Sequence, residues 1–148
     1  FDEVSRTGII QSYDLSLSNG GERGNMLFSL NYFNHDGIIR ETNFNRITAR
    51  LNSDYSFLGG RLKVGENMMF TKTRNTEIPT SDIMYLALVQ QPIVPVYTET
   101  GGWGGPAPSM TDRHNPVRLI EDNKQNKTYG GRLFGNAFVE LEVLRGLR

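Results

Sequence analysis

Residues 31–55 read NYFNHDGIIRETNFNRITARLNSDY, and this stretch decides the fold because its side chains alternate in character. Successive residues of a β-strand point to opposite faces, so the parity of a residue assigns its face. In the second half of the stretch one parity is apolar, comprising Ile47, Ala49, Leu51 and Tyr55. The other parity comprises Arg46, Thr48, Arg50 and Asn52. The pattern predicts two neighbouring strands joined by a polar loop.

The polar parity carries charges and amides rather than small hydroxyl groups alone. A strand of an ordinary sandwich also alternates, but it needs only a solvated outer face. A strand between lipid and a water-filled interior needs one apolar face and one strongly polar face. The alternation therefore favours a membrane-barrel strand.

The rest of the chain repeats this alternation at intervals. We expect strands at about residues 9–18, 25–35, 44–57, 61–74 and 127–144. Glycine-rich turns at residues 19–24 and 56–60 are short, and glycine accepts the positive φ that tight turns require. The connections at residues 36–43 and 76–126 are longer. The sequence thus predicts an all-β fold, an antiparallel up-and-down meander of about five long strands, over residues 1–148.

Residues 76–126 interrupt the rhythm of strands. Thr80 or Ser81 can cap a short helix, with Asp82 in its first turn, that runs toward Pro92. A connection of this length inside a domain is typically functional or mobile. We therefore expect one long loop that contains a short helix.

Trp103 is the most promising recognition residue in that loop, because it is the single tryptophan and lies between pairs of glycines. Exposed aromatic rings stack on sugars or peptides, and neighbouring polar groups orient such ligands. This reasoning predicts a substrate-binding set that comprises Tyr97, Trp103, Asp112, Arg113 and His114. The alternative is that Trp103 packs the loop against the strands.

Composition argues against several functions. The 16 basic and 16 acidic residues balance, so no long-range field attracts nucleic acid. The absence of cysteine excludes zinc–thiolate sites and cysteine nucleophiles. His35 and His114 stand apart, whereas a metal site needs clustered ligands. No hydrolase elbow, zinc-protease motif or phosphate loop is present, so we expect no enzyme, no metal and no cofactor.

Several motifs together resemble one protein family. They are Tyr32-Phe33-Asn34-His35-Asp36-Gly37-Ile38-Ile39, Asn43-Phe44-Asn45-Arg46, Arg50-Leu51-Asn52, and the earlier Gln11-Ser12-Tyr13-Asp14-Leu15-Ser16-Leu17-Ser18 with its Gly20-Gly21 turn. Arg132-Leu133-Phe134-Gly135-Asn136-Ala137 follows near the end. In this order they resemble the early barrel of SusC/RagA-type TonB-dependent transporters.

The resemblance implies a part of a large transmembrane β-barrel, of about 22 strands around a plug, in the outer membrane of a Gram-negative bacterium. It implies active import of oligosaccharides or peptides with energy supplied through TonB, and a SusD-like surface lipoprotein as partner. The TonB-contacting segment would lie outside this chain. Within such a barrel, the side chains expected to face the lumen or the plug are Arg46, Arg50, Arg132, Asn136 and Glu140.

Two rival functions stay open at this point. The first is a soluble β-sheet glycan-binding module with Trp103 in its site, and the second is a β-rich hydrolase. A sandwich buries its apolar faces in a core, whereas a barrel segment exposes an apolar band and two unpaired edges. One residue resists the barrel interpretation, because Glu66 has the parity of the apolar side chains around it. A bulge near Gly65 would turn it inward.

Overall fold

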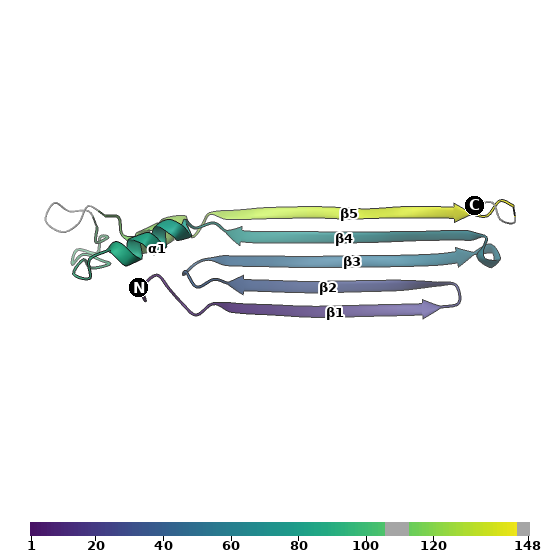
Figure 1. Ribbon diagram of the computed structural model, residues 1–148, viewed down its shortest axis with the longest axis horizontal. Coiled ribbons are helices and arrows are strands. Elements are labelled where there is room, and N and C mark those ends of the chain that lie inside the picture. The colour runs from purple at the N-terminus through teal and green to yellow at the C-terminus, as the bar shows by residue number, and fades with distance from the viewer. Residues whose placement is uncertain (106–112, 145–148) are drawn as a thin grey trace. The chain divides into compact units, whose positions relative to one another are not determined.

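The computed structural model describes residues 1–105 and 113–144 and contains one antiparallel sheet of five strands (Figure 1). The strands follow one another in the order of the sequence, β1-β2-β3-β4-β5. They are β1 (Ile9–Gly21), β2 (Gly24–Asp36), β3 (Asn43–Phe57), β4 (Leu62–Thr76) and β5 (Lys127–Leu141). Two helices, α1 (Thr80–Val89) and α2 (Pro116–Asn123), lie between β4 and β5. The predicted all-β antiparallel meander is confirmed.

The chain divides into two compact units, which we describe separately. The loop unit comprises Phe1–Ile10, Asn34–Phe44 and Arg74–Thr128. The sheet unit comprises Gln11–Phe33, Asn45–Thr73 and Tyr129–Arg148.

Cross-strand contacts in the sheet unit define its register. The rings of Tyr13 and Tyr32 lie 6.2 Å apart, and the Asn25 amide donates to Asp54 over 3.5 Å. The guanidinium of Arg50 donates to the sulfur of Met69, and the amide of Asn67 donates to that of Asn136. The first contact joins an odd residue of β1 to an even residue of β2, and the other three join odd residues of β2 and β4 to even residues of β3 and β5. Odd residues of β1, β3 and β5 therefore share one face with even residues of β2 and β4.

That face, called the apolar face below, collects most of the large apolar side chains of the sheet unit, while Leu27, Phe33, Met69, Phe134 and Phe138 have the parity of the opposite face. It comprises Tyr13, Leu15, Leu17, Met26, Phe28, Leu30, Tyr32, Ile47, Ala49, Leu51, Tyr55, Phe57, Leu62, Val64, Met68, Phe70, Leu133, Ala137, Val139 and Leu141. The opposite side, called the polar face, carries mainly hydroxyl, amide and charged groups. The parity predicted from residues 31–55 therefore extends across all the strands.

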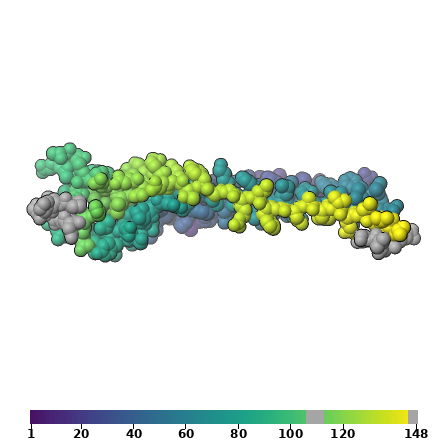
Figure 2. Space-filling model, turned by 90° about the horizontal axis from the view of Figure 1, so that it is seen from above, coloured from purple at the N-terminus to yellow at the C-terminus, as the bar shows by residue number. Residues whose placement is uncertain are grey.

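The apolar face is not covered by any other layer of the described chain. Leu15 is 51% exposed, Leu133 is 68% exposed and Val139 is 70% exposed. In Figure 2 the side chains of β5 lie along an edge of the sheet that no described segment covers. All four fully buried apolar residues of the described ranges belong to the loop unit. The sheet unit is thus a single layer without a core of its own.

The turn between β1 and β2 differs from the expected glycine turn. Its two residues are Glu22 and Arg23, and none of the neighbouring glycines has a positive φ. Gly24 is required for a different reason, since a Cβ there would lie 2.2 Å from the Asp54 carbonyl oxygen and 2.6 Å from the Tyr55 ring. Positive φ occurs instead at the β3–β4 turn, where Gly59 has φ 67°.

Glu66 remains on the apolar face, because no bulge occurs near Gly65. The ring of Phe138 lies over Gly65, and the amide of Asn67 contacts Asn136 two residues further along β4. On the other side, the Glu142 amide donates to the Arg61 carbonyl over 2.8 Å. These three pairs share one register, so no extra residue intervenes.

The loop unit has a conventional hydrophobic core. Ile83 of α1 is fully buried and packs with Val4, Ile39 and Ile120. Residues 1–7 look like a polar lead-in in the sequence, yet Val4 is only 2% exposed. The strand-like bridge between Ser5 and Ile39 carries this segment into the core.

The helix expected after Thr80 is present, but its capping residue differs from the prediction, and the loop contains a second helix. The N-cap residue of α1 is Pro79, and no side chain caps the helix, so neither Thr80 nor Ser81 has that role. The loop also contains a second helix, α2, which the sequence reasoning missed. Asn115 caps α2 and Pro116 occupies its first turn, an arrangement typical of helix starts.

We expect Ile83→Ala to destabilise the loop unit by about 2–5 kcal/mol, because it removes a fully buried aliphatic side chain and leaves a cavity. The measurement is amide hydrogen exchange in α1 and α2, where protection should fall. Leu88→Ala on the same helix is the matched control, since Leu88 is 74% exposed. Equal effects of the two substitutions would contradict this account of the core.

Candidate functional site

The first candidate site is a small hairpin at residues 95–104 of the loop unit, called the aromatic hairpin below. Tyr97 and Trp103 form an antiparallel bridge, and their ring centroids lie 4.9 Å apart at 32°. The amide of Thr98 donates to the Gly102 carbonyl over 2.8 Å, and the amide of Gly101 donates to the Thr98 carbonyl over 2.9 Å. The two predicted aromatic residues therefore form one pair on an ordered turn.

Asn115 fastens the aromatic hairpin to α2. Its Oδ1 accepts from the amides of Val117 and Arg118, which caps the helix. Its Nδ2 donates to the carbonyls of Val96 and Gly104, over 2.9 and 2.8 Å. The side chain is 5% exposed and uses both of its polar atoms, so it links the helix start to both strands of the hairpin.

The remaining predicted binding residues do not all join this pair. Arg113 donates to the Tyr85 hydroxyl over 3.1 Å, and its guanidinium lies 5.9 Å from that ring's centroid. Arg113 therefore contacts α1. His114 is exposed, and Asp112 lies outside the described residues. The grouping of all five as one substrate site stays a prediction.

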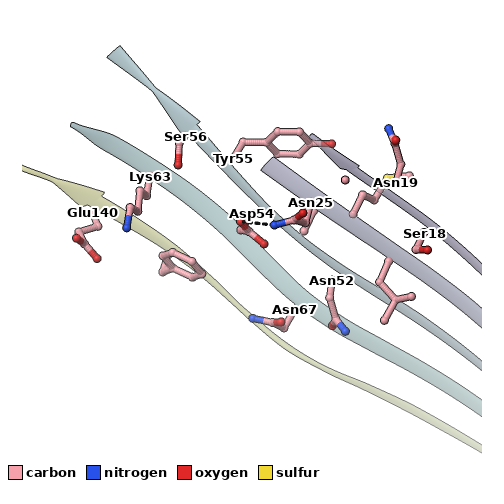
Figure 3. A pocket seen from close by; sticks show the side chains of 15 residues that line it. Ser18, Asn19, Asn25, Asn52, Asp54, Tyr55, Ser56, Lys63, Asn67 and Glu140 are labelled. Atoms are coloured by element: carbon pink, nitrogen blue, oxygen red, sulfur yellow. Dashed lines mark hydrogen bonds between the residues drawn. The ribbon is translucent and has the colours of Figure 1, made fainter. Parts of the chain in front are cut away.

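The second candidate site is the polar face of the sheet unit. The side chains predicted to face a lumen or plug all have the parity of this face, namely Arg46, Arg50, Arg132, Asn136 and Glu140. A hollow of about 770 Å³ lies toward the short-turn end of the sheet unit, and residues of all five strands line it. Figure 3 shows Asn25, Asn52, Asp54, Lys63, Asn67 and Glu140 among the residues that line it.

Sequence reasoning missed part of this arrangement. It did not single out Asn25, Asp54 or Asn67, although their parity places them on the polar face. It did not single out Asn115 either, although the position of Asn115 directly before Pro116 is a signal of a helix cap. A side chain that bonds to distant backbone carbonyls leaves no local sequence signature.

Neither candidate has the ligands of a metal site. Across residues 1–105 and 113–144, no cluster of three or more His, Cys, Asp or Glu side chains occurs. Neither helix of that same part of the chain is long and apolar enough to cross a membrane, an observation that concerns helices alone. The groups that the two candidates present are guanidinium, amide and aromatic side chains.

Comparison with known proteins gives a consistent set of relatives. The chain is 31% identical over 121 residues to the TonB-dependent receptor SusC of Bacteroides thetaiotaomicron, covering 78% of this chain and 12% of the receptor. It is 25% identical over 143 residues to TonB-dependent receptor P26 of Formosa agariphila, covering 95% of this chain and 14% of the receptor. TonB-dependent receptor P39 of that organism is 23% identical over 141 residues, with 95% and 13% covered. No family model matches.

These matches confirm the resemblance noted in the sequence. The chain spans 12% to 14% of the length of these relatives, so most of each receptor has no counterpart in it.

We expect Gly104→Ala to disrupt the aromatic hairpin, because the added Cβ would lie 1.7 Å from the Pro95 carbonyl oxygen. The fluorescence of Trp103, the single tryptophan, should change in emission wavelength and quenching. Gly105→Ala is the matched control, since a Cβ there meets nothing within 4 Å. A normal Trp103 spectrum in Gly104→Ala would refute the hairpin geometry.

Asn115→Asp separates the two roles of this residue. Aspartate keeps the acceptor that caps α2 but loses both donors to the hairpin carbonyls, and its charge then faces those carbonyls. We expect loosening of the hairpin, seen as lower Trp103 anisotropy, while the helix cap survives. Asn115→Ala should also lose the cap, which is worth about 1 kcal/mol. If Asn115→Asp leaves the anisotropy unchanged, the two donated hydrogen bonds do not hold the hairpin.

Proposed function

We propose that this chain, a segment similar in sequence to SusC-type TonB-dependent receptors, is part of the wall and outer loops of an outer-membrane transporter. The sheet unit supplies consecutive strands of a barrel. Its apolar face contacts lipid and its polar face lines the interior. The loop unit supplies the structure at the outer ends of those strands.

The exposed apolar face is the observation that carries this proposal. Soluble monomers rarely expose contiguous apolar patches larger than a few hundred Å². Here one face of a whole sheet is apolar, and nothing in the described chain covers it. Lipid is the solvent for which such a face is suited, while the opposite face suits water.

The height of the apolar face supports the same conclusion. In β3 it extends from Ile47 to Phe57, which corresponds to about 33 Å along the strand at about 3.3 Å per residue. At a strand tilt of about 40° this is about 25 Å across a membrane, the height of the apolar band of outer-membrane barrels. Aromatic pairs mark both ends, with Tyr13 and Tyr32 at one and Tyr55 and Phe57 at the other.

The connections between strands support an orientation. Outer-membrane barrels have short turns on the periplasmic side and longer loops outside. The β1–β2 and β3–β4 connections are short, and the β2–β3 and β4–β5 connections are longer. In a meander these two kinds fall on opposite ends of the strands (Figure 1). The loop unit, with the aromatic hairpin, then belongs to the cell exterior.

The relatives are named TonB-dependent receptors, and the family resemblance noted in the sequence suggests the rest of the proposal. The whole protein would be a non-enzymatic importer in the outer membrane of a Gram-negative bacterium, driven through TonB. Its cargo would be oligosaccharides or peptides, and a SusD-like lipoprotein would be its partner at the surface. The TonB contact would lie in a part of the protein beyond this chain.

A soluble glycan-binding module is less well supported. Such a module would bury its apolar faces in a closed core, whereas the buried apolar residues described here belong to the loop unit. The two outer strands, β1 and β5, each have one unpaired edge, as expected of strands that continue into neighbouring strands of a barrel.

The test is a pair of substitutions at adjacent positions of β3 in the full-length protein. Leu51→Arg places a charge on the apolar face and should destabilise the membrane-inserted state by about 2–4 kcal/mol. Asn52→Arg places the same charge on the polar face and should change stability little. Folding into lipid vesicles, followed by urea titration, measures both. Equal tolerance of the two variants, or a protein that stays monomeric in buffer without detergent, would refute the transporter assignment.

A further inference from the structure

The polar face holds a group of three arginines, Arg46 and Arg50 on β3 and Arg132 on β5, called the arginine group below. We propose that the arginine group binds the carboxylate or sulfate groups of an acidic oligosaccharide on its way through the transporter. This inference rests on the proposed function and narrows its substrate class.

The register places the arginines within one region of the face. Residues 46 and 50 are four apart on one strand, so their Cα atoms are separated by about 13 Å. Arg132 lies two strands away, at the level midway between them. Strands are about 4.8 Å apart, which puts its Cα about 12 Å from each of the others. Flexible side chains on such a triangle can reach successive charged units of one oligomer.

The three guanidiniums lack acidic partners within residues 1–105 and 113–144. Arg50 donates to the Met69 sulfur over 3.9 Å, a weak acceptor, and Arg46 lies over the Phe33 ring at 5.3 Å from its centroid. The salt bridges of the described residues, such as Arg6 with Asp36, belong to the loop unit. Guanidinium forks match carboxylate and sulfate geometry, so the group offers charge complementarity to an anion.

Acidic groups of the polar face lie mostly elsewhere. Asp54 and Glu140 line the hollow near the short turns, together with Lys63. Asp14 lies at the level of the arginine group, two strands from β3, and its carboxylate accepts hydrogen bonds from Asn31 and Ser12. Three guanidiniums thus share this level with one carboxylate. The level of the arginine group therefore has an excess of positive charge.

The neighbouring side chains favour a sugar over an acidic peptide. Next to the arginine group, toward the short turns, lies a row of amides formed by Asn52, Asn67 and Asn136, in which Asn67 donates to Asn136 over 3.3 Å. Amides donate to and accept from hydroxyl groups, which sugars carry at high density. Phe134 lies between Arg132 and Asn136 on the polar face of β5 and is 71% exposed. It offers a ring on which a sugar can stack. Charge, hydroxyl partners and a stacking ring together match an acidic oligosaccharide.

The experiment uses the full-length transporter in detergent and measures binding of three probes by calorimetry. Two probes are anionic, an oligogalacturonate and a chondroitin sulfate oligosaccharide, and a malto-oligosaccharide of equal length is neutral. We expect the protein to bind at least one anionic probe at least tenfold more tightly than the neutral one, with affinity that falls as salt rises. Arg46→Gln, Arg50→Gln and Arg132→Gln should each weaken that binding about tenfold.

Arg23→Gln is the matched control, because Arg23 is an exposed arginine in the β1–β2 turn, away from the arginine group. It should leave affinity unchanged. Heat-resistant β-structure of every variant, measured by circular dichroism in detergent, shows that the barrel has formed. This readout also separates the two proposals, since an absent barrel overturns the transporter function and the arginine site with it.

Two other results overturn the arginine site while the transporter assignment stands. The first is a folded protein that binds none of the anionic probes more tightly than the neutral one. The second is anionic binding that the arginine variants do not weaken. Raised conductance of those variants in planar bilayers would then mean that the arginines hold an acidic segment of the protein's own interior.

Discussion

The structure depends on one constraint, which is that a β-strand sends its side chains alternately to two sides. In a globular domain one side faces other protein layers, and burial there supplies most of the stability. In the sheet unit neither side faces another layer of the described chain. The two faces differ sharply in chemistry, so the sheet is suited to separate two solvents. Its backbone pairing and its side-chain pattern are both those expected of a sheet that separates two solvents.

The loop unit follows different physics. Ile83, Val4, Ile39 and Ile120 come from three separate segments and form a small buried core. Asn115 adds polar links between α2 and the aromatic hairpin, so backbone carbonyls of an irregular segment are satisfied. In the proposed orientation the loop unit faces water, and it must then provide its own core, because no lipid is present to stabilise exposed apolar side chains. The division into two units thus corresponds to two sources of stability.

The two faces of the sheet could be predicted from the parity of residues in the sequence. Features that depend on contacts between residues distant in sequence could not. The faces of Arg46, Arg50 and Leu51 follow from position alone, since strand geometry is local. The role of Val4 depends on Ile39 and Ile83, which are distant in sequence. Gly24 was expected to supply a positive φ but instead gives room to Asp54 and Tyr55 on the next strand. The face of Glu66 was left open by the sequence, and it depends on the pairing of β4 with β5, where the Phe138 ring lies beside Gly65.

Under the proposed function, alternation also separates the requirements of the membrane from those of the cargo. Leu51 lies on the apolar face, and its neighbours Arg50 and Asn52 lie on the polar face. A change in either neighbour therefore leaves the apolar face intact. Substitutions on the polar face can therefore alter charge and hydrogen bonding toward a cargo at little cost to membrane insertion. Glu66 is the exception, because it lies on the apolar face beside Val64 and Met68. A carboxyl group there costs less than an arginine would. Glu66 is thus where the two requirements meet at one residue.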